Sequence, residues 1–185
     1  MINLRIVGSS LCLSVLIGVA AQAQTAESPV YKSWAQVPVG TRMIQKTVSV
    51  GSDGSTVESK TIQTLQSIDD DVATVEQIYV DPQGEEFTQV FRHRRKVLLL
   101  PGVKAENLGI PANATDQGAE TLQIAGREFE TKWYDTTGQA EAGTMLIRTW
   151  YSNKVPGLIV KSFTRIEGFP STTTIELVDL IRPGS

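Results

Sequence analysis

The fold class of this chain is decided by the stretch Ser55-Thr56-Val57-Glu58-Ser59-Lys60-Thr61-Ile62-Gln63-Thr64-Leu65-Gln66-Ser67-Ile68. Every second position from Val57 to Leu65 forms one set of side chains, and the intervening positions form another that includes Glu58 and Ile62. Successive side chains of a strand point to opposite faces, so this spacing predicts a long β-strand. No comparable stretch shows the periodicity of a long helix.

The same pattern extends in both directions from this stretch, with turn residues between the segments. Gly51-Ser52-Asp53-Gly54 has the composition of a hairpin turn, and Asp81-Pro82-Gln83-Gly84 combines a proline that presets φ with a glycine that accepts positive φ. Roughly nine strands at near-regular spacing predict an all-β fold, namely a curved antiparallel sheet or unclosed half-barrel with little helix. The expected strands are Thr41 to Val50, Ser55 to Ile68, Val72 to Val80, Glu85 to Leu100, Glu120 to Ile124, Arg127 to Asp135, Thr144 to Ser152, Leu158 to Glu167 and Ser171 to Ile181.

One long segment, Pro101 to Gln117, interrupts this series of strands. It contains two prolines and two glycines and shows no alternation. Within it, Val103 to Leu108 is expected to form one helical turn. Long connections in compact domains are often functional, so we expect this loop to form the rim of a site.

The N-terminal segment, residues 1–23, has the layout of a secretory signal peptide. Arg5 supplies a positive charge, Ile6 to Val19 is apolar, and Ala21-Gln22-Ala23 provides a cleavage site. The apolar run is too short to span a bilayer comfortably, and no other run of that length follows. We therefore expect a periplasmic or secreted protein that is cleaved after Ala23, without a transmembrane segment thereafter. Residues 24–40 are expected to be a flexible leader and an entry turn, and residues 41–185 a single antiparallel β domain.

Composition excludes several functional classes. The only cysteine, Cys12, lies in the first half of the apolar run rather than at its end, so the mature chain has no thiol for a disulfide, a nucleophile or a metal. One of the 17 basic residues and none of the 20 acidic residues lie in the signal, which leaves a net charge of 16 − 20 = −4. This acidic balance argues against nucleic acid as a partner. No metal site, cofactor or catalytic residue is predicted.

The segment Arg92-His93-Arg94-Arg95-Lys96 is a basic cluster in an acidic chain. We consider two interpretations: an anion or headgroup site that uses Arg92, Arg94 and Arg95, and an exposed edge strand whose charges prevent pairing with another sheet. His93 is the only histidine and no partner lies at a catalytic or metal-binding spacing, so a structural role is favoured for it.

Two neighbouring strands carry aromatic pairs, Trp133-Tyr134 and Trp150-Tyr151. Adjacent residues of a strand face opposite ways, so both faces of the sheet carry aromatic rings. One interpretation is a core tryptophan beside a half-exposed tyrosine. The other is a sheet that curls around an apolar cavity. The residues predicted to line such a cavity are Phe87, Phe91, Leu99, Trp133 and Trp150.

The last third of the chain resembles a known group of proteins. A short strand, Gly118 to Ile124, leads through Ala125-Gly126 into Arg127 to Trp133; then Thr149-Trp150-Tyr151-Ser152-Asn153-Lys154 leads through Val155-Pro156-Gly157 into Leu158 to Lys161. This layout resembles uncharacterised secreted bacterial β proteins and, more distantly, the periplasmic lipoprotein-carrier and outer-membrane lipoprotein-sorting group. The resemblance implies an unclosed antiparallel barrel whose concave face binds acyl chains under a lid. The helices that cap the carrier's barrel have no clear counterpart here.

Three functions remain open from the sequence. The first is a non-enzymatic binding protein for a lipid or another apolar ligand. The second is an envelope protein-interaction module that uses an exposed strand edge by β-augmentation. The third is a hydrolase that acts through two carboxylates, which leave no fixed spacing in a sequence. The ligand, the protein partner and the oligomeric state are not predicted.

Overall fold

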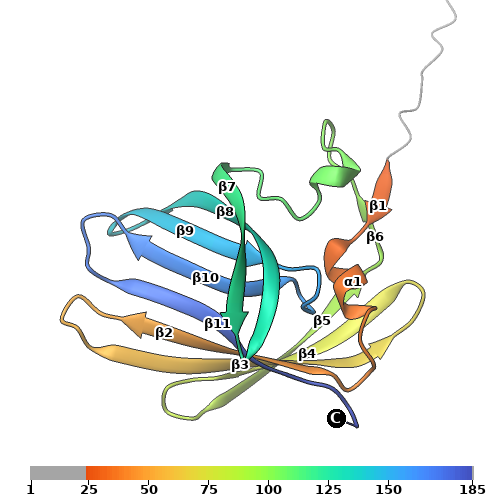
Figure 1. The fold of residues 1–185 in the computed structure, drawn as a ribbon, viewed down its shortest axis with the longest axis horizontal. Coiled ribbons are helices and arrows are strands. Elements are labelled where there is room, and N and C mark those ends of the chain that lie inside the picture. The colour runs from red at the N-terminus through yellow and green to blue at the C-terminus, as the bar shows by residue number, and fades with distance from the viewer. Residues whose placement is uncertain (1–23, 185) are drawn as a thin grey trace, which may run out of the picture.

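The computed structural model describes residues 24–184, so the expected signal peptide lies outside the described residues. Its main element is a nine-stranded antiparallel sheet in the order β5-β4-β3-β2-β11-β10-β9-β8-β7 (Figure 1). The nine expected strands correspond one to one with its members, and the all-β prediction is confirmed. The strands are β2 (Arg42–Val50), β3 (Thr56–Ile68), β4 (Val72–Val80), β5 (Glu86–Arg94), β7 (Ala114–Ile124), β8 (Arg127–Ala140), β9 (Gly143–Tyr151), β10 (Ile159–Ile166) and β11 (Thr172–Ile181).

The sheet is strongly curved and is not closed, because β5 and β7 at its two ends do not pair with each other. Figure 1 shows helix α1 (Pro29–Trp34) at one end of the curve. We call the face that packs against α1 the inner face, and the opposite one the outer face. The inner face contributes Met43, Leu65, Val75 and Leu177 to a core that also contains Trp34.

Helix α1 follows directly from its local sequence. Ser28 caps it by accepting a hydrogen bond from the backbone N–H of Tyr31, and Pro29 occupies the first turn, where a missing N–H costs nothing. Trp34 at its end is completely buried. The expectation of a flexible leader is therefore wrong for residues 25–34. The polar composition of this segment suggested flexibility, whereas the buried side chain of Trp34 anchors it.

A small second sheet ties the N-terminus to the rest of the fold. Strand β1 (Thr25–Glu27) pairs with β6 (Lys96–Leu98). The sequence predicted one strand from Glu85 to Leu100, whereas the structure ends β5 at Arg94 and begins β6 at Lys96. The interruption is Arg95, whose backbone N–H donates to Asp71 O (2.6 Å) and whose carbonyl accepts from Ser28 (2.7 Å).

The long connection is shorter than predicted at its C-terminal end, because β7 begins at Ala114. The expected helical turn is a short 3₁₀ helix, η1 (Ala105–Asn107). Among residues 24–184, no helix is both long enough and apolar enough to cross a membrane.

Candidate functional site

An apolar groove lies between the start of α1, strand β6 and the loop that follows it. Its volume is about 370 Å³, and apart from Ser28 and Gly109 every lining residue is aliphatic or proline. We call it the leucine groove. The long loop contributes Val103, Leu108 and Gly109 to this lining, but of the five residues predicted to line a cavity behind that loop only Leu99 belongs to the groove. The lining residues are Ser28, Pro29, Val30, Val97, Leu98, Leu99, Leu100, Val103, Leu108, Gly109 and Leu158.

A second groove of about 560 Å³ adjoins the first and is more polar. Tyr134 and Tyr151 meet edge to face in it, with ring centroids 5.8 Å apart. Burial raises the pKa of Tyr151, so its hydroxyl stays protonated at neutral pH and can donate a hydrogen bond. We call this the tyrosine groove. Its other lining residues are Pro29, Glu106, Leu108, Gly109, Ile110, Ala119, Glu130, Thr131, Lys132, Ser152, Asn153, Lys154 and Leu158.

Pro29, Leu108, Gly109 and Leu158 line both grooves, so the two lie next to each other and share part of their walls. The combined site is apolar at one end. At the other it presents tyrosine hydroxyls together with the ammonium groups of Lys132 and Lys154. Lys154 is an exposed residue that pairs with Glu130 at 3.2 Å.

Leu158 lies in the turn between β9 and β10 and has a backbone conformation that suits glycine. Its φ is +72°, although its side chain is 7% exposed. The preceding Pro156-Gly157 makes a turn in which the Leu158 N–H donates to Val155 O at 3.0 Å. The Gly157 N–H in turn donates to Ser33 Oγ on α1 (2.9 Å). The chain thus keeps a leucine where both grooves meet, at a cost in backbone strain of about 1 kcal/mol.

This strain predicts an inverted order of stability for two variants. Leu158→Ala and Leu158→Gly lose similar packing, about 2–5 kcal/mol, but glycine relieves the positive φ. Leu158→Gly should therefore be at least as stable as Leu158→Ala. In the control pair at Leu65, which is fully buried in β3, the glycine variant should be the less stable one. Urea unfolding of the four variants measures both differences in stability. If the glycine variant were the less stable one at both positions, the proposed backbone strain at Leu158 would be contradicted.

The structure does not bring the five predicted cavity residues together. Leu99 lines the leucine groove. Phe91 and Phe87 face Val75 and Tyr79 across β4 and β5, which puts them on the inner face but outside both grooves.

Trp133 and Trp150 are paired directly across β8 and β9, on the outer face. Trp150 neighbours Lys161, whose ammonium lies 5.9 Å from its ring, and Lys161 pairs with Glu176 at 2.8 Å. The alternative interpretation of a core tryptophan beside a half-exposed tyrosine is wrong, because Tyr134 is the buried member of its pair.

The outer face has its own groove of about 360 Å³, which Trp150, Arg148 and Phe163 line in part. The Arg148 guanidinium lies 3.9 Å from the centre of the Trp133 ring and donates two 2.7 Å hydrogen bonds to Asp135. These bonds hold the pKa of Asp135 below its usual value. The part of Trp150 in ligand binding stays a prediction.

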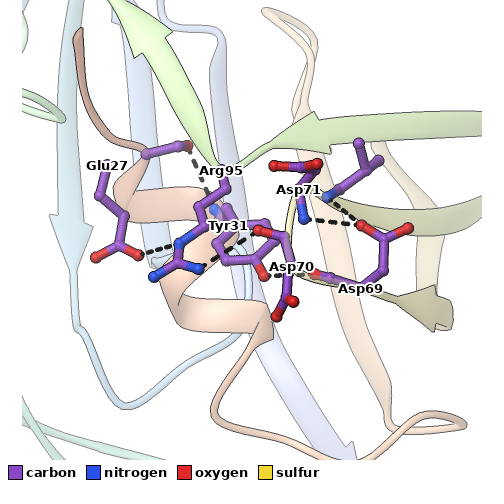
Figure 2. A network of polar contacts seen from close by, with 8 residues as sticks. Glu27, Tyr31, Asp69, Asp70, Asp71 and Arg95 are labelled. Atoms are coloured by element: carbon purple, nitrogen blue, oxygen red, sulfur yellow. Dashed lines mark hydrogen bonds and ion pairs between the residues drawn. The ribbon is translucent and has the colours of Figure 1, made fainter.

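The three arginines of the predicted anion site have different surroundings. Arg92 and Arg94 lie exposed on β5, which is an edge strand, as the charged-edge interpretation requires. Arg95 is engaged in a network that connects β1 to the 69–71 turn (Figure 2). Its Nε donates to Glu27 at 2.9 Å, and the Tyr31 hydroxyl on α1 donates to Asp69 O at 2.6 Å.

His93 is partly buried against Phe91, with ring centroids 6.3 Å apart, and burial lowers its pKa. The unfolded chain then binds more protons, so stability should fall as the pH drops through the unfolded value of about 6.5. In His93→Gln, stability should decline less between about pH 8 and pH 5.5 than in the parent. Thermal unfolding at several pH values measures this difference. If the stability of the parent and of His93→Gln fell equally with decreasing pH, the lowered pKa of His93 would be contradicted. Among residues 24–184, no group of three or more histidine, cysteine or carboxylate side chains could hold a metal ion.

The sequence analysis did not select Pro29, Leu108 and Leu158, which the two grooves share. No local signal identifies them, because each comes from a different connection or cap and they meet only in the folded chain. The position of Leu108 in the long loop was the one usable indication.

No protein-family model matches the chain, and no curated protein matches it. Among solved structures, a “putative lipoprotein” from Parabacteroides distasonis aligns with a TM-score of 0.52 and 11% identity over 78% of this chain and 96% of the other. A “putative exported protein with YmcC-like fold” from Bacteroides fragilis aligns with a TM-score of 0.50 and 11% identity, over 79% and 97%. A LolA superfamily protein from Nitrosomonas europaea has a TM-score of 0.33 and 9% identity, over 88% and 96%. The two alignments with TM-scores of 0.52 and 0.50 show a likeness of fold alone, to proteins whose names describe them as a lipoprotein and an exported protein.

Proposed function

We propose that this protein is an exported, non-enzymatic binding protein for an amphipathic lipid. The apolar tail lies in the leucine groove and the polar head lies in the tyrosine groove. The observation that carries the proposal is that an apolar groove and a more polar groove lie side by side and share Pro29, Leu108 and Leu158 as lining residues.

The size and lining of the leucine groove support a tail-binding role. Both volumes fall within the range of small-molecule sites, which are mostly apolar with a few polar groups that fix orientation. The Leu99 and Val97 side chains are half-buried there and still partly exposed to solvent. An acyl chain in the groove would remove this remaining apolar surface from water, which is favourable in proportion to the area buried.

The polar end supports an anionic or hydroxylated head. Tyr134 and Tyr151 offer hydroxyl donors, and Lys132 lies exposed at the margin of the same groove. An ammonium group binds phosphate or carboxylate as a point charge. The signal-like residues 1–23 support a periplasmic location, where such a ligand would need protection from water.

The test is a titration of the mature chain, beginning at Gln24, with dansylaminoundecanoic acid, whose fluorescence rises and shifts to the blue in apolar surroundings. We expect saturable binding near one molecule per chain that oleate displaces. A signal that does not saturate, or that oleate leaves unchanged, would count against the groove as a lipid site.

A second candidate function is protein binding at the edge of the sheet. Strand β5 is an end strand of the nine-stranded sheet and exposes Phe87 (59%) and Val90 (57%). An extended segment of a partner could add to this edge by main-chain hydrogen bonds. Arg92 and Arg94 would restrict the choice to partners with acidic side chains.

A further inference from the structure

The two most exposed large apolar side chains among residues 24–184 are close in sequence, Leu98 at the end of β6 and Leu100 in the loop that follows it. Leu98 is 70% exposed and Leu100 is 72% exposed, and Val103 nearby is 37% exposed. Side chains along an extended segment alternate, so Leu98 and Leu100 lie on the side opposite Val97 and Leu99, although all four contribute to the lining of the leucine groove. Exposed apolar side chains gathered in this way mark interaction sites.

Cationic residues flank these leucines in the sequence. Between residues 94 and 106, the chain carries Arg94, Arg95, Lys96 and Lys104 against the single carboxylate of Glu106, whereas the whole chain has a net charge of −3. Lys96 lies on the same side of β6 as Leu98, and both are exposed. Lys104 is 74% exposed and only loosely paired with Glu106, at 3.7 Å. Arg95, in contrast, is neutralised by Glu27.

We propose that Leu98, Leu100 and Val103 form a docking surface for an anionic lipid bilayer, with Lys96 and Lys104 at the headgroups. Apolar side chains enter the boundary between headgroups and acyl chains, and cations nearby are attracted to anionic lipids. Of the possible occupants, an anionic bilayer fits best, because its acyl chains accept the apolar side chains and its headgroups offer negative charges to the two lysines. A purely apolar partner surface would leave the lysines without a counter-charge. This inference goes beyond ligand binding and does not require the grooves to be occupied.

The geometry also explains what such docking would achieve. The leucine groove is lined by the same short segment, 97–100, that carries the exposed leucines. Docking through Leu98 and Leu100 therefore brings the apolar end of the groove to the membrane surface. A lipid tail could then pass between the bilayer and the groove with little contact with water.

The test is flotation of the mature chain with vesicles of phosphatidylcholine alone and with vesicles that contain phosphatidylglycerol. We expect binding to the anionic vesicles that weakens with added salt. The double variant Leu98→Ser/Leu100→Ser should lose about 100-fold in affinity, tenfold for each leucine. Lys96→Gln/Lys104→Gln should lose about 25-fold on anionic vesicles and little on neutral ones, at about fivefold for each lysine.

The matched control is Val39→Ser/Val90→Ser, which removes two valines that are 50% and 57% exposed elsewhere on the surface. It should bind vesicles like the parent. Absence of vesicle binding, or binding that the leucine variant leaves unchanged, would overturn the proposal. The proposal would also be overturned if the parent formed a dimer and the leucine variant were a monomer, because the surface would then bind a second copy of the chain.

The fatty-acid titration distinguishes this proposal from the proposed function. A chain that binds dansylaminoundecanoic acid but not vesicles retains the lipid site and loses the docking surface. A chain that binds vesicles but not the probe does the reverse.

Discussion

Replacing Trp34 by alanine is expected to lower the free energy of unfolding by about 3–5 kcal/mol. The side chain is completely buried at the end of α1, in a core with Met43, Leu65 and Leu177 from three strands of the sheet. A void of indole size there removes these contacts, and α1 has only six residues with which to hold itself in place. Urea unfolding followed by tyrosine fluorescence or circular dichroism measures the change.

Two further variants make this prediction specific. The Trp34 indole N–H has no hydrogen-bond partner among the described residues, so Trp34→Phe keeps most of the ring and removes an unsatisfied donor. It should cost clearly less than the alanine variant. Trp150→Ala, on the outer face, should cost less still. A loss of under about 1 kcal/mol for Trp34→Ala would mean that the N-terminal segment is not anchored as the structure has it.

Leu108→Asp is expected to reduce the affinity for dansylaminoundecanoic acid by about 100-fold, because a carboxylate in the shared part of the two grooves repels a fatty acid and loses hydration when the site fills. Leu108 lies in the loop after η1 and is not part of the buried core. The thermal midpoint should therefore hardly move, which separates lost binding from lost folding. Leu108→Ala should cost about tenfold, since it removes apolar contact alone.

Two control variants decide where the ligand lies. Val178→Asp places the same charge on β11 at a residue that is 41% exposed, and it should bind the probe like the parent. Trp150→Ala tests the alternative groove on the outer face. Loss of binding in Trp150→Ala together with normal binding in Leu108→Asp would mean that the ligand binds in the outer-face groove instead.

The sheet was predictable because its signals are local. The alternation from Ser55 to Ile68 and turns such as Asp81-Pro82-Gln83-Gly84 need no information from distant residues. The break at Arg95 was not predictable, because it depends on hydrogen bonds to Asp71 and Ser28, which are far away in the sequence. The same applies to β1 and α1, which are held by β6 and by the burial of Trp34.

The environment of the aromatic residues was beyond sequence analysis for a different reason. Phe129 and Trp133 lie on one side of β8 by alternation, yet Phe129 is buried in the core and Trp133 lies beside Arg148 on the outer face. Strand β8 pairs with β9 only from Lys132 onward, so its first residues and β7 form a two-stranded ribbon. Such ribbons twist more than wider sheets, and alternation cannot report by how much.

The most direct test of the central claim is native mass spectrometry of the mature protein purified from its own envelope, followed by organic extraction and lipid analysis. The account predicts one amphipathic lipid per chain, present in the parent and lost in Leu108→Asp. A protein that is empty from its own envelope and still refuses added fatty acids and phospholipids would contradict the account, and the exposed edge of β5 would then be the site to examine.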